Sequence, residues 1–185
     1  LGTVPARNVI HKDVSPANII WNRQAGTVEL IDFGIAAELA RETASAGAQA
    51  FEGTLPYIAP EQTGRMNRSV DWRADFYALG ATLYELLTGR VPFEGEDTLA
   101  VVHGHIARAP VPPSQIDPSV PPMVSDIVLK LLSKDPEARY QSGFGLKADL
   151  EACLAALEGG QAVPVFTLGR QDRSERFRIP ERLYG

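Results

Sequence analysis

The sequence predicts a fold of the α+β class that is mainly α-helical, with short β-hairpins near its N-terminus. Three observations support this prediction. Short apolar and β-branched runs lie before position 32, residues 74–87 are apolar in nearly every direction around a helix, and residues 124–132 and 146–157 carry apolar side chains at helical spacing. We therefore expect a few strands, then a loop, then a helical lobe.

The strands are short, and the loop after them is long. Residues 19–21 and 28–31 flank a polar turn that contains Gly26, which is typical of a hairpin. Residues 34–56 are rich in Ala, Gly, Thr and Ser and show no clear periodicity. Because a loop of that length in a compact domain often serves a function, we expect the chemistry on the early loops.

The helical part is predicted to surround one buried helix. A helix that is apolar all round belongs at the centre of a domain, and Gly89 and Pro92 end this one. Residues 98–106 are expected to form a surface helix with His103 and His105, and residues 109–122 a proline-rich extended connection. Periodicity ends after residue 160, so we predict a domain over residues 1–158 and a linker toward a further domain over residues 159–185.

Composition narrows the class of protein. The 185 residues are 44% apolar and 22% charged, as is ordinary for a globular domain, and the formal charge of −5 argues against nucleic-acid binding. One cysteine allows no intrachain disulfide, which fits a reducing, cytoplasmic location. No apolar run approaches the roughly 18 residues of a membrane helix. We expect neither a nucleic-acid nor a membrane partner.

Two polar clusters carry the residue types that phosphoryl transfer needs. Asp13 and Asn18 lie in the first cluster, and Asp32 precedes Phe33 and Gly34 in the second. Transfer from ATP requires magnesium held by oxygen ligands and a carboxylate near the attacking hydroxyl. Asp13 can orient that hydroxyl, Asn18 and Asp32 can bind magnesium, and Gly34 lets the backbone turn sharply.

The two clusters resemble the catalytic loop and the Asp-Phe-Gly motif of protein kinases. Residues 53–61 resemble the end of a kinase activation segment, residues 71–80 the start of its buried central helix, and residues 135–140 a late arginine-containing motif. These ordered matches imply the large, C-terminal lobe of a serine/threonine protein kinase. ATP and magnesium are then the expected cofactors, and a protein serine or threonine the expected acceptor.

The resemblance also implies a role for each matching residue. Asp13 would be the catalytic aspartate, and Thr54 would tether its loop. The other assignments are Lys12 and Asn18 in the catalytic loop, Asn18 and Asp32 as magnesium ligands, Ile20 and Ile31 beside the nucleotide with Ile20 under the adenine, and His11, Phe33, Gly34, Glu61, Asp75 and Arg139 as structural support. Within that support, Arg139 is expected to hold Glu61 in a buried bidentate pair.

Two residues depart from the kinase pattern. Lys12 replaces an arginine that in many kinases grips a phosphate on the activation loop, so we expect activity to depend weakly on phosphorylation of Thr43 or Ser45. Ser15 replaces a lysine that would neutralise the transferring phosphoryl group. Similar loops without this lysine occur in large bacterial multidomain sensor kinases, which the sequence resembles. The tail resembles the joint to an AAA-type ATPase module there, so ATPase and sensor modules are expected partners.

No Gly-rich phosphate loop and no lysine-bearing strand precede the catalytic loop in this sequence. We therefore expect the N-terminal lobe to be missing, and this chain alone to bind ATP poorly. Two other functions stay open. A small-molecule phosphotransferase would share the Asp–Asn loop but generally lacks the 53–61 segment and Arg139. A non-catalytic pseudokinase would tolerate Lys12 and Ser15, although the intact Asp13 argues against it.

Overall fold

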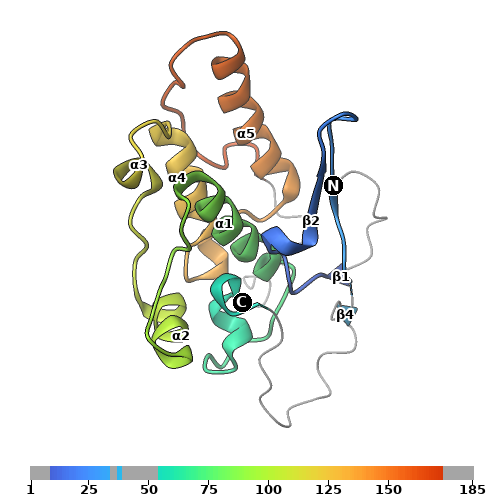
Figure 1. Ribbon diagram of the computed structural model, residues 1–185, viewed down its shortest axis with the longest axis vertical. Coiled ribbons are helices and arrows are strands. Elements are labelled where there is room, and N and C mark those ends of the chain that lie inside the picture. Colours follow the sequence, from blue (N-terminus) through green and yellow to red (C-terminus); the bar gives the residue numbers. More distant parts are fainter. Residues whose placement is uncertain (1–8, 34–36, 39–53, 173–185) are drawn as a thin grey trace, which may run out of the picture.

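A computed structural model describes residues 9–33, 37–38 and 54–172 (Figure 1). The strands are β1 (Val9–Ile10), β2 (Ile19–Asn22), β3 (Thr27–Leu30) and β4 (Ala37–Glu38). The helices are α1 (Arg73–Thr88), α2 (Thr98–Ala107), α3 (Pro113–Ile116), α4 (Pro122–Leu131) and α5 (Gly143–Glu158), with 3-10 turns η1 (Pro16–Asn18), η3 (Leu55–Tyr57), η4 (Pro60–Thr63) and η5 (Pro136–Ala138). The fold is therefore α+β and mainly α, as predicted.

The predicted hairpin is present as the antiparallel pair β2–β3, in which Ile19 lies opposite Leu30. Its turn is made by Gly26 with a φ of 65° and by the Asn22 side chain, whose Oδ1 accepts hydrogen bonds from two backbone N–H groups at 3.1 Å. A second antiparallel pair joins β1 to β4. β4 falls in the segment expected to be loop, because a two-residue strand leaves no periodic signal in the sequence.

The predicted core helix is α1, which lies at the centre of the helical region with α5 and α2 toward opposite ends (Figure 1). Tyr77 and Ala81 are fully buried in it, and it packs against α4. Gly80 permits this contact, since a Cβ there would lie 2.7 Å from the Cβ of Leu131. Gly89 ends α1 in the left-handed conformation, with a φ of 72°.

The chain that follows α5 also packs on the helical core. Val163, Phe166 and Leu168 contact the cluster that α4 and α5 form with Tyr140. Asp172 accepts hydrogen bonds from Gln141 N at 2.7 Å and Ser142 Oγ at 2.7 Å, at the start of α5. The sequence pattern did not indicate these contacts. The division at residue 159 stays a prediction, and residues 173–185 lie outside the described part of the chain.

Two helical details differ from the expectations. Residues 113–116, inside the connection expected to be extended, form α3, because proline is tolerated in the first turn of a helix. α2 is only partly a surface helix, because Val102 and His105 are 1% and 0% exposed. Among the described residues, no helix is long and apolar enough to cross a membrane.

Candidate active site

The 11–18 loop leaves β1 and is held from below by α1. Asp75 accepts hydrogen bonds from the backbone N–H groups of His11 and Lys12, each at 2.8 Å. Lys12 has a φ of 69°, a conformation that non-glycine residues rarely adopt, and these bonds help to hold it. The structure thus places Asp75 against the loop in the way that the sequence predicted.

Both carboxylate oxygens of Asp13 accept a hydrogen bond. Asn18 Nδ2 donates to Oδ2 at 2.9 Å, and the backbone N–H of Thr54 donates to Oδ1 at 2.9 Å. The same Asn18 nitrogen also donates to the Asp13 carbonyl at 2.9 Å. An ionised carboxylate can accept further bonds, so Asp13 is oriented and still able to receive a hydroxyl proton. The contact with residue 54 is made by backbone, so it does not depend on the threonine side chain.

The hairpin brings Asn18 and Asp32 to the same end of the β2–β3 ladder. The backbone N–H of Ile31 donates to the Asn18 carbonyl at 2.9 Å, one residue before Asp32. Asp32 has a φ of 61°, a second left-handed residue in the site. Both hydrogens of Asn18 Nδ2 go to Asp13, which leaves the amide oxygen Oδ1 to bind a cation. A carboxylate and an amide oxygen suit magnesium, so these two residues fit the predicted metal role.

His11 and Phe33 connect the loop to the second cluster. Their rings meet edge to face, with centroids 4.6 Å apart. The backbone N–H of Asp13 donates to His11 Nδ1 at 3.3 Å, and His11 Nε2 lies 3.1 Å from the Ile31 carbonyl. Through these two contacts His11 forms a bridge between the 11–18 loop and the residue that follows β3. Gly34 lies outside the described residues.

The hairpin exposes apolar side chains on both of its faces. Trp21 and Val28 lie opposite each other on one face and are both 63% exposed, whereas Ile20, 49% exposed, points to the other face. Ile31 and Phe33, which follow β3, are 38% and 49% exposed. The placement of Ile20 and Ile31 beside the nucleotide stays a prediction.

Arg139 and Glu61 form the predicted bidentate pair. Arg139 Nη1 and Nη2 donate to the two Glu61 oxygens at 2.6 and 2.9 Å, and both side chains are at most 1% exposed. Arg139 also donates to the carbonyls of Arg73, Lys134 and Ser133. All five guanidinium N–H groups are therefore bonded, as a buried charge requires.

Two positioning residues were missed by the sequence analysis. Gln62 accepts from Ala59 N at 3.0 Å and donates to the Lys12 carbonyl at 3.1 Å, so it joins η4 to the 11–18 loop. Thr82 Oγ1 donates to the Val14 carbonyl at 3.1 Å from inside α1. A signal for Thr82 existed, because it lies two turns after Asp75 on the same face of an otherwise apolar helix. We find no such signal for Gln62.

Ser15 is a buried residue of the 11–18 loop. It is 1% exposed, and its hydroxyl has no hydrogen-bond partner among the described residues. It supplies no charge to the site, so whatever neutralises a transferring phosphoryl group lies elsewhere. Thr43 and Ser45 lie outside the described residues, and the expectation about their phosphorylation stays a prediction.

Burial shifts the pKa of three side chains in the helical region, His105, Lys134 and Tyr57. Burial, and after it the nearby Lys134 cation, lowers the pKa of His105 to about 4. Burial likewise lowers the pKa of Lys134 to about 8. Burial raises the pKa of Tyr57, whose hydroxyl donates to Glu85 at 2.6 Å and so ties η3 to α1. The helical region therefore holds a neutral His105 close to the Lys134 cation, whose Nζ donates to the Gly104 carbonyl at 3.1 Å.

Comparison with known proteins places these features in a family. The model of the protein kinase domain matches residues 3–148. The chain is 42% identical over 147 residues to the probable serine/threonine-protein kinase SCO3848 of Streptomyces coelicolor, covering 79% of this chain and 21% of that protein. It is 44% identical over 144 residues to serine/threonine-protein kinase PknB of Mycolicibacterium smegmatis, covering 77% and 22%.

A third relative extends the match into the tail. The probable serine/threonine-protein kinase CE0033 of Corynebacterium efficiens is 39% identical over 180 residues, which cover 95% of this chain and 26% of that protein. The chain therefore spans only about a fifth to a quarter of the length of these relatives. With the family model matching most of the chain, and with these relatives, the chain belongs to the protein kinase family, of the serine/threonine type.

Proposed function

We propose that this chain is the large, C-terminal lobe of a serine/threonine protein kinase. In the full protein, this lobe and an N-terminal lobe would together form the ATP site. The observation that carries the proposal is the Asp13 carboxylate, held on one oxygen by Asn18 and on the other by Thr54 N. These bonds orient a proton acceptor in the 11–18 loop, next to Asn18, whose amide oxygen would bind a cation together with Asp32. The proposal includes a kinase lobe over residues 1–158 and a linker over residues 159–185. It also includes a cytoplasmic location and downstream ATPase and sensor modules in the full protein.

In the proposed reaction a serine or threonine hydroxyl attacks the γ-phosphorus of ATP. The new O–P bond forms as the bond to the β-phosphate oxygen breaks, ADP leaves, and Asp13 receives the hydroxyl proton. Magnesium would be held by Asn18 Oδ1 and Asp32, and when bound it neutralises phosphate charge. Ile20 and Ile31 would lie against the nucleotide, while His11, Phe33 and Asp75 keep the loop in position.

The test is phosphate transfer by the full-length protein, with Asp13→Asn as the variant and the exposed Asp126→Asn on α4 as its matched control. We expect transfer to protein serine or threonine, lowered about 100-fold or more by Asp13→Asn and unchanged by Asp126→Asn. Transfer to small alcohols alone would replace the proposal by a phosphotransferase. ATP binding without any transfer would favour the pseudokinase function, for which the uncharged Ser15 is the supporting observation.

A further inference from the structure

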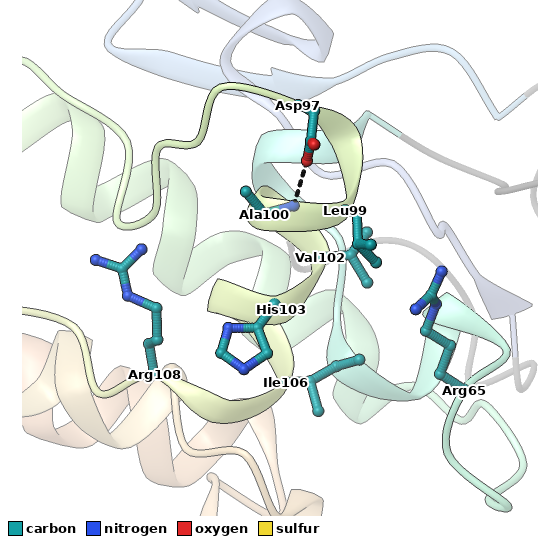
Figure 2. A pocket seen from close by; sticks show the side chains of 8 residues that line it. All are labelled: Arg65, Asp97, Leu99, Ala100, Val102, His103, Ile106 and Arg108. Atoms are coloured by element: carbon teal, nitrogen blue, oxygen red, sulfur yellow. Dashed lines mark hydrogen bonds between the residues drawn. The ribbon is translucent and has the colours of Figure 1, made fainter.

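A hollow on the outer side of α2 is not used by the proposed reaction. It has a volume of about 510 Å³, and Figure 2 shows it between α2 and the segment that carries Arg65. We call it the α2 pocket and define it by its apolar side chains Leu99, Val102 and Ile106 and its basic side chains Arg65, His103 and Arg108. Leu99 is 53% exposed, so the pocket presents apolar surface to solvent.

The helix that forms the pocket is fixed firmly in place. Asp97 caps its N-terminus by accepting from Ala100 N at 2.7 Å (Figure 2). On the inner face Gly104 approaches Phe93 so closely that a Cβ would lie 2.7 Å from the Phe93 Cβ, and His105 is fully buried. A rigid helix face is a favourable docking surface because little conformational entropy is lost when a partner binds.

Charge distinguishes this pocket from an ordinary apolar hollow. In Figure 2 the guanidinium groups of Arg65 and Arg108 flank the apolar side chains on opposite sides. Both residues are exposed, and within the described ranges neither guanidinium has a hydrogen bond or an ion pair. The Asp97 carboxylate also lines the pocket and keeps its negative charge, but its Oδ1 is engaged in the helix cap. Two arginines against one carboxylate leave this hollow locally positive, although the chain as a whole has a net charge of −5, and the local charge favours an acidic partner.

The position of the α2 pocket near the loop that carries Asp13 suggests that its partner is the protein substrate. α2 packs against the turns η3 and η4. η3 begins directly after Thr54, whose backbone N–H donates to the Asp13 carboxylate. We propose that the α2 pocket docks an acidic segment of the protein substrate, with one apolar residue between Leu99 and Ile106 and carboxylates on Arg65 and Arg108. This inference rests on the proposed function, because it assigns the docked segment to the substrate of the same site.

The test measures binding without ATP, by fluorescence anisotropy on the 185-residue chain. The probes are labelled nine-residue peptides with a central Leu or Phe, flanked on both sides either by four Glu or by four Lys residues. We expect the acidic peptides to bind, and Arg65→Glu/Arg108→Glu to weaken them at least about tenfold while strengthening the basic peptides. The control is Arg90→Glu/Arg170→Glu, at two exposed arginines outside the pocket. It changes the net charge of the chain by the same amount as the pocket variant, and it should leave the preference for acidic over basic peptides unchanged.

A second pair of variants tests the apolar anchor. Leu99→Ser should weaken the acidic Leu and Phe peptides severalfold, whereas Leu86→Ser, at a comparably exposed leucine on α1, should not. Equal effects of the pocket and control variants would overturn the inference. It would also be overturned if peptide binding increased on dilution of the chain and sedimentation showed that a second copy occupies the pocket at higher concentration. Peptide binding without transfer in the full protein would refute the proposed function alone, and transfer that the pocket variants leave unchanged would refute the docking alone.

Discussion

At the scale of single residues, His105 shows how the helical region handles a buried titratable group. The ring is fully buried, and the hydroxyl of Tyr77 lies 3.0 Å from Nδ1. Lys134 approaches the same tyrosine at 3.4 Å and lies 4.1 Å from the centre of the Phe93 ring. Burial, and after it the Lys134 cation, disfavours a positive charge on the ring, so the imidazole stays neutral at pH 7.

This neutrality predicts a loss of stability in mild acid. The pKa of His105 is about 4 in the folded chain and about 6.5 in the unfolded chain, so between these values only the unfolded state takes up the proton. The free energy of unfolding should therefore fall by about 3 kcal/mol from this group as the pH drops from 7 to below 4. Denaturant titrations at several pH values measure the effect.

The matched comparison lies on the same helix. His105→Gln should flatten the pH dependence between 7 and 4, whereas His103→Gln, at an exposed site, should reproduce that of the unmodified chain. Acidic groups also titrate near the lower limit, but they do so in all three proteins. An unchanged slope in His105→Gln would show that the buried ring does not control acid stability.

At the scale of elements, the pair of Arg139 and Glu61 joins η4 to the turn after η5, across 78 positions of sequence. It also reaches the Arg73 carbonyl at the start of α1, at 2.8 Å. Arg139 thus fixes the end of η5 to two elements that precede it by 78 and 66 positions. Because the charges are fully buried, the pair contributes position more than net stability.

Removing one partner should therefore be costly. Arg139→Met leaves the Glu61 carboxylate buried without its counter-charge, and we expect a loss of about 3–5 kcal/mol in the free energy of unfolding. The control is Arg68→Met, which breaks the exposed pair with Asp135 at 2.7 Å and should cost less than about 1 kcal/mol. Urea titration of both variants makes the comparison. A similar loss in both would mean that the buried pair is not the constraint described here.

At the scale of the whole molecule, the hairpin and the residues after it expose apolar side chains. Among the described residues Ile20, Trp21 and Phe33 are each at least 49% exposed. Under the proposed function the N-terminal lobe and the adenine of ATP would cover the side of the hairpin that carries Ile20. The chain alone then offers only one wall of a nucleotide site.

Calorimetry with ATP and magnesium tests that arrangement. We expect weak binding to this chain and at least about 100-fold tighter binding to a protein extended upstream by an N-terminal lobe, because a nucleotide enclosed on both sides buries far more of its surface. Asp32→Ala should abolish the tight binding, and Asp126→Ala should not. Equally tight binding to the chain alone would contradict the idea that half the site is absent.

Much of the site was predictable because its parts are local in sequence. The 11–18 loop, Asp32, Asp75 and the α1 boundaries follow from short motifs and helical periodicity, which depend on neighbouring residues. The structure brings Asp13, Asn18 and Thr54 together as those motifs imply. The pair of Glu61 and Arg139 was also predicted, through family resemblance and not through any pattern within the chain.

Other features were decided only by tertiary packing. The periodicity of a sequence indicates that a face is apolar, but it does not indicate which segment covers that face. The sequence therefore could not predict that His105 is buried, that Gln62 bridges η4 and the 11–18 loop, or that residues 163–172 pack on α4 and α5. The two arginines of the α2 pocket, which have no ion pair with any residue that the structure describes, are of the same kind. An arginine is paired or unpaired according to which distant segment folds next to it, and that depends on the whole chain.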